Sequence, residues 1–410
     1  MARLLALGGL LAAFLFVGSG SRPPAGKCGA PEWGFFAHKR INRLAVFLLP
    51  PDMMVFFKKH IDWISDHAVD ADMRRYATKN EAPRHYIDLD LYGEPPFDRL
   101  PRLFPDAIQE FAAIYAVDRR NDTLIVYDPR AERSTDERKV WRRFFATQVV
   151  RQFHRADPRL HPDTLRQFIL RENLPLPSSS DWRDAFFVES LSEHGIVPWH
   201  LQKMQRDLTA AFKSKDSKRI LRMAADIGHY IGDAHVPLHT TSNYNGQKTN
   251  QHGIHAFWES RIPELFADKQ YDYFVGKAYY VNDPAKFYWD MVLASNSMVD
   301  SVLNIEWSLR HTFPKDRQIC PTMRNGVAML APCPDYAAAY QDALNGMVER
   351  RMRSAILSLA SAWYSAWVDA GQPNLSRMDE PVASAEQLKE DEEVRNSFGR
   401  GQIFGRPEEH

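Results

Sequence analysis

The sequence lacks several features that mark common classes of protein. Lys plus Arg and Asp plus Glu both number 52, so the formal net charge is zero and no basic surplus exists to capture a polyanion by its field alone. The sequence has no glycine-rich phosphate loop, no Gly-x-Ser-x-Gly nucleophile elbow and no internal repeat. Cysteine is also scarce, with three in 410 residues. Any chemistry must therefore come from other residue types.

A long apolar run near the N-terminus predicts a secretory signal. Residues 1–21 contain LLALGGLLAAFLFV after Arg3, followed by small residues. This run is too short to span a bilayer comfortably. A lipoprotein anchor at Cys28 is the alternative, which Lys27 directly before it disfavours. The expected location is secreted or periplasmic.

The remaining composition, 44% hydrophobic, suits a folded helical protein. We expect one large domain over 33–373, with 100–200 as a helical insertion or variable part, and a polar, disordered tail over 374–410. Apolar periodicity predicts helices over 105–117, 140–154, 184–214 with an interruption near Pro198, 220–233, 255–266, 288–313 and 337–370, the last stopping at Gly371.

Histidines are concentrated in one stretch of the chain. Five lie within the 27 residues from His229 to His255, where the overall frequency predicts about one. His229 and Asp233 are four apart on a predicted helix, so imidazole and carboxylate project from one face. Pro237 should end that helix and leave His239 free to turn back.

The same spacing recurs in the following helix, where His255 and Glu259 are four apart. One such pair is most often an exposed polar pair, but two pairs with His239 indicate a hydrolytic zinc site. His235 and His252 are expected to be polar bystanders. His154, His161, His194 and His200 show no ligand spacing and are expected to be structural.

The motif HYIGDAHVPLH, followed by HAFWE, resembles the core signature of the zinc-dependent phospholipase C and S1/P1 nuclease superfamily. That resemblance implies an all-α, single multi-helix domain with a trinuclear zinc site. It also implies ligands upstream. Trp33 would bind one zinc through its amino nitrogen and carbonyl oxygen if processing exposes it, and His38, five residues later, would complete that site. The alternative is that both residues simply pack at a helix start.

Two further matches lie before the histidine stretch. HYID at His85 resembles the first zinc-binding histidine of the family, and ADMRR resembles its Asp followed three residues later by Arg. This implies Asp72 as a ligand and Arg75 as a phosphoryl-binding residue, with Asp70 a close competitor for the role of Asp72.

The resemblance implies three zinc sets. The first is Asp72, His85, His229 and Asp233; the second is Trp33, His38 and Asp233; the third is His239, His255 and Glu259. Asp233 would bridge the first two, and a zinc-bridged hydroxide would attack phosphorus. Asp72, Arg75 and Asp233 are the residues expected to act in catalysis.

Two substrate classes remain open. The short His239–His255 connection and Glu259 resemble the phospholipase C branch, whereas Trp33 and His38 resemble the nuclease branch. We therefore expect a phospholipase C-like phosphodiesterase acting on phospholipid head groups, with transient membrane-surface contact and no obligate protein partner. The alternative is a single-strand nuclease or 3'-nucleotidase, for which Tyr86, Tyr244 and Trp258 are candidate base platforms. A secreted protein with structural zinc is a second alternative, which the cysteine-free, carboxylate-rich ligand set disfavours.

Cys320 and Cys333 bracket a short loop. They would either form a disulfide or remain two free thiols.

Overall fold

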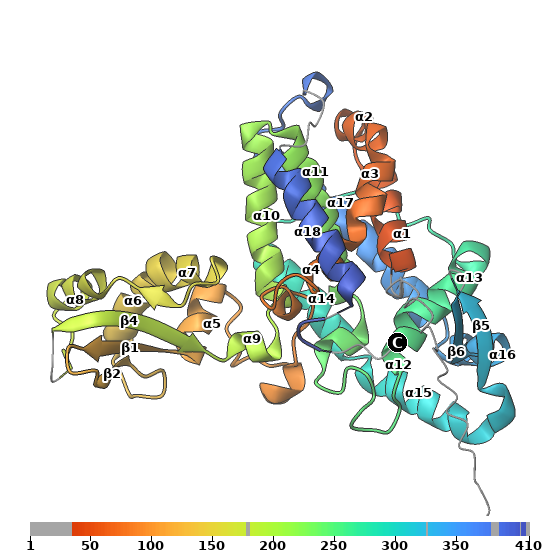
Figure 1. The fold of residues 1–410 in the computed structure, drawn as a ribbon. Coiled ribbons are helices and arrows are strands. Elements are labelled where there is room, and N and C mark those ends of the chain that lie inside the picture. Colours follow the sequence, from red (N-terminus) through yellow and green to blue (C-terminus); the bar gives the residue numbers. More distant parts are fainter. Residues whose placement is uncertain (1–34, 178–180, 325–326, 379–384, 402, 407–410) are drawn as a thin grey trace, which may run out of the picture.

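The computed structural model describes residues 35–177, 181–324, 327–378, 385–401 and 403–406. Within these ranges the chain is mostly helical and also forms two small antiparallel sheets (Figure 1). The expectation of a mostly helical chain is thus confirmed, whereas the two small sheets were not expected. The proposed signal over 1–21, Cys28 and Trp33 lie outside the described residues. Among the described helices, none is long and apolar enough to cross a membrane.

The α-helices are α1 (Phe35–Ala45), α2 (Pro51–Lys59), α3 (Ile61–Asp66), α4 (Asp70–Arg74), α5 (Phe104–Phe111), α6 (Thr135–Phe144), α7 (Val150–His154), α8 (Pro162–Arg171), α9 (Leu191–His194), α10 (Val197–Ser214), α11 (Ser217–Ala234), α12 (Ile254–Ala256), α13 (Ile262–Gln270), α14 (Pro284–Asn296), α15 (Val299–Thr312), α16 (Pro334–Ala343), α17 (Met347–Asp369) and α18 (Ala385–Arg400). The strands are β1 (Ala112–Asp118), β2 (Thr123–Tyr127), β3 (Arg159–Leu160), β4 (Trp182–Glu189), β5 (Ile319–Arg324) and β6 (Val327–Pro332).

Helix α11 lies at the centre of the helical body and packs against α1, α10, α14 and α17. From Ala224 to Ala234 every residue is buried, as expected for a helix with neighbours on all sides. A tight hairpin joins it to α10. Lys215 adopts φ +55°, and the carboxylate of Asp216 accepts the N–H of Arg219 as an N-cap. The predicted stop at Pro237 is confirmed, because α11 ends at Ala234 and Pro237 opens a short 3-10 helix.

Two glycines on α11 allow α1 to approach closely. A Cβ at Gly228 would lie 1.9 Å from Oδ1 of Asn42, and a Cβ at Gly232 would lie 2.6 Å from Nδ1 of His38. Asn42 secures the contact by donating to the carbonyls of Ala225 and Ile64. The glycine spacing thus sets the position of His38 over α11.

The part of the chain over 100–200 differs from its prediction. Helix α5 ends at Phe111 and the chain continues as β1, while the segment Trp182–Glu189 forms β4. The sheet order is β2-β1-β4-β3, and α5, α6, α7 and α8 lie on one side of it (Figure 1). The predicted helices over 112–117 and 184–189 are therefore wrong. Burial alternates along β1 with period two, a strand pattern that the preceding helical periodicity concealed.

Two long predicted helices are each broken in two. The segment 288–313 forms α14 and α15, separated at Ser297 and Met298. The segment 337–370 forms α16 and α17, separated where Asn345 and Gly346 both take positive φ. The stop at Gly371 is confirmed, since its N–H donates to the carbonyl of Val368 beyond the end of α17.

The C-terminal tail also departs from its prediction. Residues 385–400 form α18, which packs against α4, so the expectation of a disordered tail over 374–410 is wrong for that part. Phe398 of α18 packs its ring edge-on against Tyr76 at 5.0 Å between centroids.

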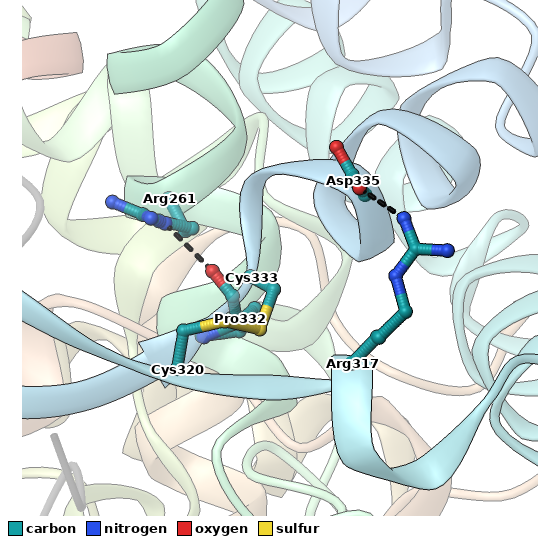
Figure 2. The surroundings of a disulfide bond; sticks show 6 residues. All are labelled: Arg261, Arg317, Cys320, Pro332, Cys333 and Asp335. Carbon is teal, nitrogen blue, oxygen red and sulfur yellow. Dashed lines mark hydrogen bonds and ion pairs between the residues drawn. A yellow bond between two sulfur atoms is a disulfide. The ribbon is translucent and has the colours of Figure 1, made fainter.

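Cys320 and Cys333 form a disulfide at the base of the β5–β6 hairpin (Figure 2). Their Cα atoms are 5.0 Å apart, within the range that a disulfide spans. Arg261 donates to the carbonyl of Pro332 beside it at 3.1 Å, and Arg317 pairs with Asp335. The hairpin is thereby tied to the segment that carries Glu259.

Candidate metal centre

The described candidate ligands come from separate parts of the chain and meet at one end of α11. His38 lies on α1, Asp72 on α4, and His85 directly after a short 3-10 helix at Ala82–Arg84. The others lie on α11, on the 3-10 helix Pro237–Thr240, on α12, or in the π-helical turn Phe257–Arg261; they are His229, Asp233, His239, His255 and Glu259. All are at most 9% exposed except Asp72, whose side chain is 20% exposed.

The first ligand group surrounds Oδ2 of Asp233. Nδ1 of His85 lies 3.0 Å from that oxygen, and Nε2 of His229 lies 3.4 Å from it. The two ring nitrogens are 3.1 Å apart. Oδ1 of Asp72 lies 3.5 Å from His229 and 3.8 Å from His85. The donor atoms of His85, His229 and Asp233 thus form one group, and Asp72 of α4 lies beside it.

A second group surrounds Oε2 of Glu259. Nε2 of His255 lies 2.7 Å from this oxygen and Nε2 of His239 lies 3.3 Å from it. The two Nε2 atoms are 3.2 Å apart. The four-residue spacing of His255 and Glu259 therefore brings both side chains to one point despite the π-helical turn between them.

His38 lies between the two groups. Its Nε2 is 3.4 Å from Oδ1 of Asp233 and 3.3 Å from Oε1 of Glu259. Asp233 thus directs Oδ2 to His85 and His229 and Oδ1 to His38, as the bridging role implied by the resemblance requires. Glu259 likewise directs its two oxygens to different histidines, which the resemblance did not imply.

The proton positions in three of these histidines point to a cation at the centre. Nδ1 of His229, His239 and His255 each meets a backbone carbonyl, at 2.9, 2.7 and 3.1 Å respectively. Because a carbonyl only accepts, each Nδ1 carries a proton, and Nε2 is the ring nitrogen that can hold a second proton or offer its lone pair to a metal ion. Those lone pairs face carboxylate oxygens or one another. The arrangement is stable only if a proton or a metal ion lies between them.

The distances fit a metal ion of the size of zinc. Ligand atoms about 2.0–2.2 Å from a tetrahedral ion are roughly 3.3–3.5 Å apart. The described groups His85–His229–Asp233, His239–His255–Glu259 and His38–Asp233–Glu259 each bring their donor atoms within 4.8 Å of one another. These buried groups could hold metal ions.

The site also concentrates negative charge away from water. Burial by itself would raise the pKa values of Asp72, Asp233 and Glu259, but the surrounding imidazoles outweigh it and lower all three. Burial likewise opposes charging of His229, yet the carboxylates of Asp233 and Asp72 prevail and raise its pKa to about 10. The buried carboxylates of Asp233 and Glu259, with Asp72 beside them, require positive charge close by.

The competition between Asp70 and Asp72 is resolved by geometry. Asp70 pairs with Nδ1 of His67 at 2.7 Å, on the outside of α4, whereas Asp72 faces His229. Arg75 lies beside the cluster, with Nη1 3.7 Å from Oδ1 of Asp72.

A buried network behind His85 was not foreseen. Glu81 is fully buried and accepts from Arg84, Arg74 and the hydroxyl of Tyr230. Arg74 and Arg84 hold the pKa of Glu81 at about 2 despite its burial. Nothing in the sequence pattern marks Glu81 as buried, because two of its three partners, Arg74 and Tyr230, come from α4 and α11.

Tyr86 follows the candidate ligand His85, and the carbonyl of Tyr244 binds His255; with Asp88 they form a group beside the cluster that we call the mouth box. The guanidinium of Arg406 lies 3.4 Å from the centroid of Tyr86 and 4.7 Å from that of Tyr244, and it pairs with Asp88. Of the three aromatic platforms considered, Trp258 is excluded, since it is 3% exposed and packs in the core.

The other histidines take structural positions. His235 is bound by the carbonyl of Ile231 and the hydroxyl of Ser354, and His252 joins none of the ligand groups. His154 and His200 line a cavity of about 920 Å³ that borders Tyr86 and Gly405. None of the candidate metal ligands lines that cavity.

In comparisons with known proteins, neither a family model nor a curated protein sequence matches the chain.

Proposed function

We propose that this chain is a zinc-dependent hydrolase of phosphate esters, a phospholipase C-like phosphodiesterase whose cluster takes three zinc ions. The observation that carries the proposal is the pair of carboxylates, Asp233 and Glu259, each turning its two oxygens to different histidines. Such sharing favours several ions close together over a single ion.

The ligand chemistry favours a catalytic zinc site. Imidazole and carboxylate both suit zinc, and the ligand groups contain no cysteine, unlike most structural zinc sites. Zinc would lower the pKa of water to near neutrality and polarise a phosphoryl oxygen. His38, Asp72, His85, His229, Asp233, His239, His255 and Glu259 would hold the ions, with Trp33 as a further ligand if processing exposes it.

Residues of the chain itself would bind and orient the substrate. Arg75, next to the ligand Asp72, would donate to phosphoryl oxygens through its forked guanidinium. The mouth box would take the rest of the substrate. Two aromatic faces with a carboxylate suit a cationic head group such as choline.

A single-strand nuclease is the second candidate, and the same mouth box favours it. The rings of Tyr86 and Tyr244 both approach the planar guanidinium of Arg406, and aromatic rings of this kind serve as base platforms. In either case the proposal includes secretion or a periplasmic location after removal of residues 1–21.

The test is hydrolysis by purified protein that begins at Trp33 and is loaded with zinc. Phosphatidylcholine vesicles and single-stranded DNA are supplied in parallel, with and without a chelator. Chelator-sensitive release of phosphocholine alone supports the phospholipase, and release of nucleotides alone supports the nuclease. If zinc-loaded protein cuts neither substrate, the hydrolase proposal fails and a structural role for zinc takes its place.

A further inference from the structure

Residues 403–406, which follow α18, lie against the segments that carry Arg75 and the mouth box. The N–H of Phe404 donates to the carbonyl of Arg75 at 2.9 Å. In return, Nη2 of Arg75 donates to the carbonyl of Arg406, also at 2.9 Å. The C-terminal segment therefore engages Nη2 of Arg75, while Nη1 lies 3.7 Å from Oδ1 of Asp72.

The segment lies directly on the chain around the ligands. A Cβ at Gly405 would lie 2.3 Å from the Cβ of Ala82, so glycine permits the close approach. Beyond it, Arg406 lies between Tyr86, the neighbour of His85, and Tyr244, whose carbonyl binds His255. One side chain thus touches residues adjoining both ligand groups.

The ion pair between Arg406 and Asp88 is incomplete. Among the described residues, Oδ1 of Asp88 and Nη1 of Arg406 are buried without a hydrogen-bond partner, so the carboxylate and guanidinium are not paired at both ends. A fully matched pair would use two parallel hydrogen bonds. A ligand that pairs with Asp88 and contacts the rings of Tyr86 and Tyr244 equally well can therefore displace Arg406.

We propose that residues 403–406 form an autoinhibitory strap, in which Arg406 fills the mouth box and the segment holds Arg75 away from substrate. Substrate must displace the strap before it reaches the metal centre. Release of the strap, by a partner or by cleavage after α18, activates the protein. The kinetic part of this proposal rests on the proposed function, but the binding part does not.

The kinetic test compares the full chain with Arg406→Ala and with a chain truncated after Gly401. Arg395→Ala is the matched control, because Arg395 is an exposed arginine on the same C-terminal segment. We expect kcat/KM to rise about tenfold or more in Arg406→Ala and in the truncated chain, mainly through KM, and to stay unchanged in the control. Arg406→Lys, which keeps the charge but loses the planar group, should fall in between.

The binding test requires no catalysis. A synthetic peptide of residues 398–410 is titrated calorimetrically into the truncated chain and into the full chain. We expect saturable binding to the truncated chain, weakened at least tenfold by Tyr244→Ala in that chain, and no binding to the full chain. The peptide should also inhibit the truncated chain competitively.

The two tests separate failure of the strap from failure of the hydrolase. If the peptide binds as expected but no form cuts any substrate, the strap stands and the proposed function falls. If Arg406→Ala hydrolyses substrate at the unaltered rate and the peptide does not bind, residues 403–406 are only a structural tail. If the truncated chain does not fold, Arg406→Ala decides alone: an unaltered kcat/KM overturns the proposal.

Discussion

At the scale of single residues, Asp233 connects the two ligand groups. Oδ2 faces His85 and His229, while Oδ1 lies near His38 and, at 3.9 Å, near His239. Its place on α11, four residues after His229, is fixed by helix geometry alone. Removing its charge would leave the surrounding imidazoles without a shared anion.

Replacing Asp233 with Asn should therefore remove zinc and activity together. We expect activity to fall roughly a thousandfold or more, since a bound zinc supplies several kcal/mol of transition-state stabilisation. Zinc content by mass spectrometry and hydrolysis rate are measured on the same sample. Asp136→Asn, at an exposed position on α6, is the control that should change neither. A fully loaded, active Asp233→Asn protein would refute the bridging role.

At the scale of elements, the packing of α1 on α11 sets the middle of the cluster. Neither helix carries a complete ligand set, and the glycines at 228 and 232 determine how closely the two can approach. The glycine face of α11 therefore helps to position the candidate ligand His38 although it offers no ligand itself.

Gly232→Ala should push His38 away from Asp233 and Glu259. Its new Cβ would lie 2.6 Å from Nδ1 of His38, closer than packing allows. We expect a loss of about 1–3 kcal/mol in the free energy of unfolding, as for other overpacked positions, and weaker zinc binding. Denaturant unfolding and zinc titration measure the two effects. Gly399→Ala on α18 meets no atom within 4 Å and should leave both unharmed. Equal behaviour of the two variants would show that α1 can shift freely.

The β5–β6 hairpin depends on its disulfide in a different way. The Cys320–Cys333 bond closes a short loop, with a sequence separation of 13 residues. Replacing both cysteines with alanine should lower the free energy of unfolding by about 3 kcal/mol. Because neither cysteine belongs to a metal-ligand group, zinc content should not change. Thermal unfolding with and without reductant gives the comparison, and reductant should have no effect on the double variant. Thiol titration first shows whether the bond has been reduced. If it has, and the wild-type protein still unfolds at the same temperature with and without reductant, the prediction is contradicted.

At the scale of the whole molecule, an open cavity of about 920 Å³ lies between β4 and the helical body and is lined in part by the half-buried His154 and the buried His200. Burial, followed by the nearby charges of Lys203, Arg206 and Arg84, lowers the pKa of His154 to about 4. The unfolded chain would bind a proton at this histidine near pH 6.5, whereas the folded protein would not. Unfolding therefore takes up a proton between those two pH values.

Protonation of His154 should accordingly leave the free energy of unfolding unchanged above pH 6.5 and lower it as the pH drops toward 4. The loss amounts to about 3 kcal/mol, from a pKa difference of roughly 2.5. His154→Gln should unfold with a shallower acid dependence than the wild type in this range. The exposed His161→Gln is the control and should retain the wild-type slope. Identical slopes for His154→Gln and the wild type would show that His154 does not titrate on unfolding.

The sequence by itself determined what local periodicity and spacing can fix. The four-residue intervals His229–Asp233 and His255–Glu259, the helix stop at Pro237 and the cap at Gly371 depend on neighbours in the chain, and the structure has each of them. Resemblance supplied His38, Asp72 and His85, and the structure brings these three to the same cluster.

Only the tertiary structure decided what depends on distant neighbours. Residues 112–117 and 184–189 became strands because β1 and β4 pair with each other, and pairing between distant segments overrides local helical preference. The double role of Glu259, the burial of Glu81 and the position of Arg406 in the mouth box likewise require contacts between segments far apart in the chain. Such contacts leave no period or spacing in a single sequence, because their geometry is set by packing.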